Sequence, residues 1–71
     1  MKGVAAIEYR KMVQRIREEF EETPGLRLTV PEASRFWGLD EAFCELVLAE
    51  LAVDGFLARS SDKRFQMYVS V

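Results

Sequence analysis

Apolar residues in the first third of the chain recur at helical spacing. Four of them follow at intervals of four, three and four residues, which places them on one face of a helix: Tyr9, Val13, Ile16 and Phe20. Residues 23–25 then read Thr-Pro-Gly, and both proline and glycine interrupt helices. The pattern therefore predicts a first helix over residues 4–22.

A second, shorter helix is indicated by the residues at its two ends. Thr29 and Glu32 have the spacing of a capping box, in which each side chain accepts a hydrogen bond from the other residue's backbone N–H. Gly38 supplies the left-handed position that often ends a helix. We expect this helix over residues 30–37.

A third helix begins directly after that glycine. Asp40 is a suitable N-cap, and Gly55 is suited to the left-handed conformation after the helix ends. Between them lies an inward stripe at helical spacing: Cys44, Val47, Leu48 and Leu51. The pattern predicts a helix over residues 41–54.

The last part of the chain alternates with period two. Residues 56–59 and 64–69 each read as a strand, with Ser60-Ser61-Asp62-Lys63 as the turn between them. Apolar side chains occupy every second position of the final stretch: Phe65, Met67, Val69 and Val71. We expect a half-buried hairpin over residues 56–69.

Composition and charge fit one small globular domain over residues 1–71. Half of the residues are apolar, about a third are charged, and the net charge of −2 gives no overall attraction to nucleic acid or anionic lipid. No stretch is apolar enough for a membrane span, and a single cysteine, Cys44, fits a reducing cytoplasm. The start at Met1 is compatible with a complete small protein and with a fragment.

An enzyme is not expected. The chain has no histidine, one cysteine and no glycine-rich phosphate loop, so the usual bases, metal ligands and nucleotide cradles are missing. Cys44 holds an inward position without a base beside it, which indicates a core residue. We therefore predict no catalytic residue, no metal site and no cofactor.

The order of helix, helix, tight turn, helix and hairpin resembles the winged-helix superfamily of bacterial transcription regulators. The similarity covers residues 28–69 and rests on seven positions: Leu39, Cys44, Val47, Leu48, Leu51, Gly55 and Phe56. It implies a mainly α fold with a small β-hairpin, the three-helix winged helix-turn-helix. It also implies a third helix that enters the DNA major groove.

The third helix carries the wrong side chains for that task. The groove-facing positions hold no lysine, arginine, asparagine or glutamine: Asp40, Glu41, Ala42, Phe43, Glu45, Leu46, Ala49 and Glu50. Residues 39–54 hold five acidic side chains and no basic one, and phosphates repel them. Contact with duplex DNA is therefore expected from the hairpin and second helix, through Arg35, Arg59, Lys63 and Arg64. These four side chains also fit a solvated surface.

The same helix offers a surface for protein binding. Phe43 and Leu46 lie off the inward stripe, so they form either an apolar patch with an acidic rim or a surface covered by the first helix or the hairpin. The acidic rim consists of Asp40, Glu41, Glu45 and Glu50. Two functions follow as hypotheses. The first is a DNA-binding regulator or accessory factor. The second is an interaction module that binds a second copy or a basic protein.

Overall fold

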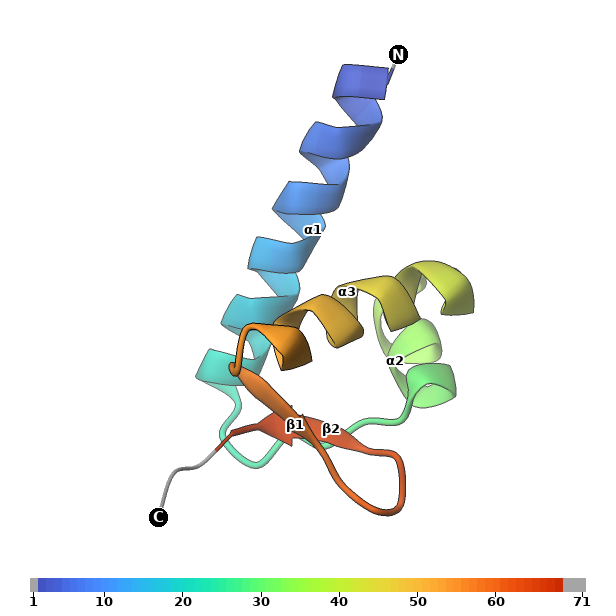
Figure 1. Cartoon of the computed structure of the whole chain (residues 1–71). Coiled ribbons are helices and arrows are strands. Elements are labelled where there is room, and N and C mark those ends of the chain that lie inside the picture. The colour runs from blue at the N-terminus through green and yellow to red at the C-terminus, as the bar shows by residue number, and fades with distance from the viewer. Residues whose placement is uncertain (1, 69–71) are drawn as a thin grey trace.

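A computed structural model describes residues 2–68, with side chains from Glu8 onward. The elements are α1 (Lys2–Glu22), α2 (Val30–Trp37), α3 (Glu41–Val53), β1 (Leu57–Arg59) and β2 (Phe65–Met67). Figure 1 shows α3 crossing α1, with the hairpin on the opposite side from the start of the chain. The predicted layout of three helices and a β-hairpin is confirmed.

The first helix is longer than the body that it packs against. Its apolar face reaches full burial only in the C-terminal half, where Ile16 and Phe20 have no exposed surface. Tyr9 and Val13 on the same face are half-buried. The molecule is consequently elongated, 42 × 22 × 20 Å, with the N-terminal half of α1 projecting past α3 (Figure 1). The helix begins at Lys2, two residues earlier than predicted.

Capping groups position the two shorter helices as expected. The capping box is formed, with the Thr29 amide donating to Glu32 Oε1 at 2.9 Å and the Glu32 amide donating to Thr29 Oγ1 at 3.3 Å. Gly38 closes α2 in the left-handed conformation at φ 66°. Asp40 accepts from the first amides of α3. That helix ends at Val53, one residue earlier than predicted.

The hairpin is fastened to the rest of the chain through a contact that the sequence pattern did not indicate. β1 and β2 pair antiparallel with Leu57 opposite Met67. Leu28, expected only as an extended link, forms a bridge with Phe65 through two backbone hydrogen bonds of 3.1 and 2.7 Å. Both strands are shorter than predicted, and Val69 and Val71 lie outside the described residues.

One core joins the helices to the hairpin. Among the side chains described, from Glu8 to Tyr68, nine are buried: Ile16, Phe20, Ala33, Cys44, Val47, Leu48, Leu51, Leu57 and Phe65. The inward stripe predicted for the third helix is among them, and burial raises the pKa of the Cys44 thiol. Over residues 2–68, no helix is long and apolar enough to cross a membrane.

Candidate functional site

The outward face of α3 carries an exposed apolar stripe. Four side chains at intervals of four, three and four residues form it, and we call them the outer stripe: Ala42, Leu46, Ala49 and Val53. Leu46 is 61% exposed and Val53 is 86% exposed. Acidic side chains, all exposed, border the stripe on both sides and are called the acidic flanks: Glu41, Glu45, Glu50 and Asp54. The helix is therefore apolar on two opposite faces, one in the core and one in solvent.

The sequence left open whether Phe43 and Leu46 form one exposed patch or are both covered, and the structure gives a different surrounding to each. Leu46 is exposed, whereas Phe43 is half-buried against α1. The Phe43 ring meets the Tyr9 ring edge to face, at 5.8 Å between centroids and 88° between planes. Three residues span about 300° of a helix, which leaves these side chains roughly 60° apart, enough to turn one toward α1 and the other to solvent. Coverage by the first helix thus holds for Phe43 alone.

A hydrogen bond fixes the crossing of α1 and α3. The Tyr9 hydroxyl donates to Glu50 Oε1 at 2.7 Å and lies 3.4 Å from the Leu46 carbonyl oxygen. The carboxylate of Glu50, together with partial burial, raises the pKa of Tyr9 to about 12. The sequence showed Tyr9 only as an apolar position of the first helix. Its partners Leu46 and Glu50 lie 37 and 41 positions further along the chain, and a local pattern cannot link residues so far apart.

The raised pKa gives a test of this crossing. A phenol whose pKa is higher in the folded state stabilises that state below the usual pKa of 10.0, and the contribution is lost as pH rises through about 12. In a Tyr68→Phe background, absorbance of the phenolate should show that Tyr9 ionises at about pH 12, well above the usual pKa of 10.0. Adding Glu50→Gln should bring the ionisation back toward 10.0. Ionisation of Tyr9 near pH 10.0 in the Tyr68→Phe chain that retains Glu50 would contradict the hydrogen bond.

One of the three cations on the hairpin, Arg64, is neutralised within the molecule. Arg64 Nη1 lies 2.7 Å from Glu32 Oε1, and its Nε lies 3.2 Å from Asp62 Oδ2. Arg27 lies 3.9 Å from the same Asp62 carboxylate. The Thr29 amide lowers the pKa of Glu32, with Arg64 adding to the effect, and the Ser60 hydroxyl lowers the pKa of Asp62. Both carboxylates stay charged at neutral pH and compete with any phosphate for these arginines.

The other three candidate DNA contacts belong to different elements, α2, β1 and the hairpin turn. Arg35 is exposed on α2 and shares a hollow of about 400 Å³ with Arg64, beside the exposed Phe36. Arg59 stacks over the Phe65 ring at 5.0 Å from its centroid. Lys63 is exposed in the hairpin turn, at φ 67°. The structure thus brings Arg35 and Arg64 together, while Arg59 and Lys63 do not line that hollow.

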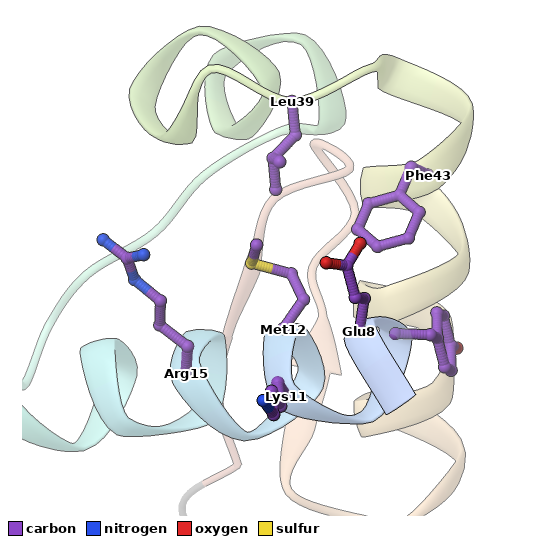
Figure 2. A pocket seen from close by; sticks show the side chains of 7 residues that line it. Glu8, Lys11, Met12, Arg15, Leu39 and Phe43 are labelled. Atoms are coloured by element: carbon purple, nitrogen blue, oxygen red, sulfur yellow. The ribbon is translucent and has the colours of Figure 1, made fainter. Parts of the chain in front are cut away.

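A groove of about 490 Å³ lies between the N-terminal half of α1 and the start of α3, and we call it the α1 groove. Figure 2 shows Met12, Leu39 and Phe43 converging on it from α1, the turn before α3 and α3 itself. Lys11 and Arg15 line its edge, and the Glu8 carboxylate lies between Met12 and Phe43 (Figure 2). The sequence did not predict this groove, because its lining comes from segments far apart in the chain.

Comparisons with family models, curated proteins and solved structures found no match. Within the part of the chain that the structure describes, histidine, cysteine and carboxylate side chains form no cluster of three or more suited to a metal ion. The α1 groove and the outer stripe with its acidic flanks are therefore the features from which a function is argued.

Proposed function

We propose that this chain is a winged-helix interaction module that binds protein, not DNA, through the outer stripe of α3. The observation that carries the proposal is an apolar stripe bordered by carboxylates on the helix that would otherwise read DNA. A helix with apolar residues on opposite faces is typically buried on both. Covering Leu46 and Val53 removes apolar surface from water, which favours association.

The charge distribution weighs against DNA as the partner. Residues 40–54 carry five acidic side chains and no basic one, so insertion into a groove lined by phosphates would be repulsive. Arg64, one of the three cations of the hairpin, is held by two carboxylates. The same acidic flanks attract a protein surface that has an apolar centre and a basic rim.

A photo-crosslinking side chain at position 46 tests the proposal in cells that express the chain. We expect a discrete protein adduct from position 46 and none from position 61, an exposed control site in the hairpin turn. The adduct should disappear when Glu41 and Glu45 are both changed to lysine, since the acidic flanks then repel a basic rim.

Titration of the purified chain with a mixed-sequence DNA duplex tests the alternative function, DNA binding. We expect no saturable binding at about 200 mM salt, and little at about 50 mM. An adduct between position 46 and nucleic acid, or duplex binding that Leu46→Asp abolishes, would overturn the proposal in favour of DNA recognition. A protein adduct that persists after reversal of the acidic flanks would equally contradict it.

A further inference from the structure

Resting on the proposed function, we infer that the partner of the outer stripe is a second copy of this chain, which receives the stripe in its α1 groove. The pairing is reciprocal, so that each copy gives one stripe and one groove. Such an exchange closes with two-fold symmetry, the commonest arrangement of homodimers. The inference rests on complementary charge, complementary shape and the adjacency of the two surfaces.

The middle of α1 is basic and α3 is acidic, although α1 as a whole carries five basic and five acidic side chains and Arg17 pairs with Glu21. Residues 10–17 of α1 carry four basic side chains and no acidic one, whereas residues 40–54 carry five acidic side chains and no basic one. Lys11 and Arg15 lie four residues apart and edge the groove, and no ion pair joins Arg15 to Glu19. Glu8 inside the groove offsets only one of these two cations. Opposite charge on the two surfaces attracts a partner copy and disfavours pairing of stripe with stripe.

The shapes are complementary in the same sense. The outer stripe is a ridge whose larger side chains, Leu46 and Val53, alternate with the small Ala42 and Ala49. The groove is lined by the apolar Met12, Leu39 and Phe43 with the Glu8 carboxylate among them (Figure 2), and Lys11 and Arg15 also belong to its lining. An apolar ridge with acidic sides thus meets a lining that combines apolar side chains with two cations. Leu46 is the side chain suited to enter the groove.

Position on the molecule makes the exchange reciprocal. Phe43 of the groove and Leu46 of the stripe lie about 60° apart around α3, so the two surfaces adjoin along this helix. A two-fold axis near these residues places each stripe over the opposite groove. A standard interface takes about 800 Å² from each partner, roughly a sixth of the 5093 Å² surface of this chain. The projecting half of α1 adds surface that a single copy leaves open.

Sedimentation of two charge-reversed variants tests the inference. One carries Lys11→Glu with Arg15→Glu, and the other carries Glu41→Lys with Glu45→Lys. Each alone should dimerise about tenfold or more weakly than the parent, because both of its interfaces then bring like charges together. An equimolar mixture should form a heterodimer, since every contact is again between opposite charges. Higher salt should weaken the parent dimer.

A matched control changes the same number of charges elsewhere. Glu18→Lys with Glu22→Lys reverses two exposed carboxylates, also four residues apart, at the far end of α1. This variant should dimerise like the parent. Leu46→Gln, at an exposed position whose change leaves the core intact, should weaken the dimer without reversing any charge.

Several results would overturn the inference. These are a parent chain that is monomeric at millimolar concentration and low salt, a mixture that forms no heterodimer, or a Leu46→Gln dimer as tight as the parent. The proposed function fails separately. If the chain is monomeric and crosslinks a different protein from position 46, only the inference of a second copy fails. If position 46 crosslinks nucleic acid, the proposed function and the inference both fail.

Discussion

Replacing Phe65 with alanine is expected to lower the free energy of unfolding by about 3–5 kcal/mol. The side chain is 2% exposed and belongs to the single core, and its backbone pairs with Leu28 on one side and Arg59 on the other. Alanine removes the ring from this packing and leaves a cavity where the hairpin meets the helices. A chain of this length has a total stability of roughly 4–11 kcal/mol, so a large fraction of it depends on this ring.

Urea unfolding followed by circular dichroism measures the effect, with Tyr68→Ala as the matched control. Tyr68 is an aromatic residue three positions further along the chain and is 61% exposed. Its replacement should change the stability by about 0.5 kcal/mol or less. Equal losses for the two variants would show that the hairpin does not share the core with the helices.

Leu48→Ala and Leu46→Ala should differ sharply although they lie two residues apart on α3. Leu48 has no exposed surface and packs in the core, so its truncation should cost about 2–5 kcal/mol. Leu46 is 61% exposed in a single copy, and its truncation should change the stability of the monomer by about 0.5 kcal/mol or less. The comparison separates the face of α3 that holds the fold from the face that we propose binds a partner.

Both variants are measured by urea unfolding at a protein concentration low enough to keep the chain monomeric. Repeating the measurement at high concentration adds the contribution of association, because a partner that binds only the folded state raises apparent stability. Leu46→Ala should lose that added stability, and Leu48→Ala should retain it. Similar costs for the two leucines in the monomer would contradict the orientation of α3.

The fold was predictable where the signal is local. The capping box of Thr29 and Glu32, the Asp40 cap and the left-handed Gly38 each depend on residues within a few positions, and each is confirmed. The inward stripe of α3 was equally readable, because burial against a core imposes helical periodicity on apolar residues. The ends of the described elements differed by one or two residues.

The candidate site was less predictable because its contacts are distant in sequence. The acidic character of α3 was visible, but the coverage of Phe43 by Tyr9 was not, and neither was the hydrogen bond from Tyr9 to Glu50. The hairpin cations Arg59, Lys63 and Arg64 looked equivalent in sequence. In the fold, one is held by two carboxylates and one stacks on an aromatic ring. Which cations stay accessible to a phosphate is a property of the packing.

The bridge between Leu28 and Phe65 also governs how this chain reaches its fold. It closes a loop of 37 residues, and fixing the ends of a loop that long costs about 3 kcal/mol of chain entropy. The helices and the tight turn at Gly38 need only local contacts and form on faster timescales. Once α2 and α3 have folded onto each other, the loop is shorter and stiffer, and its ends meet at lower cost. We therefore expect the hairpin to dock after α2 and α3 have packed together.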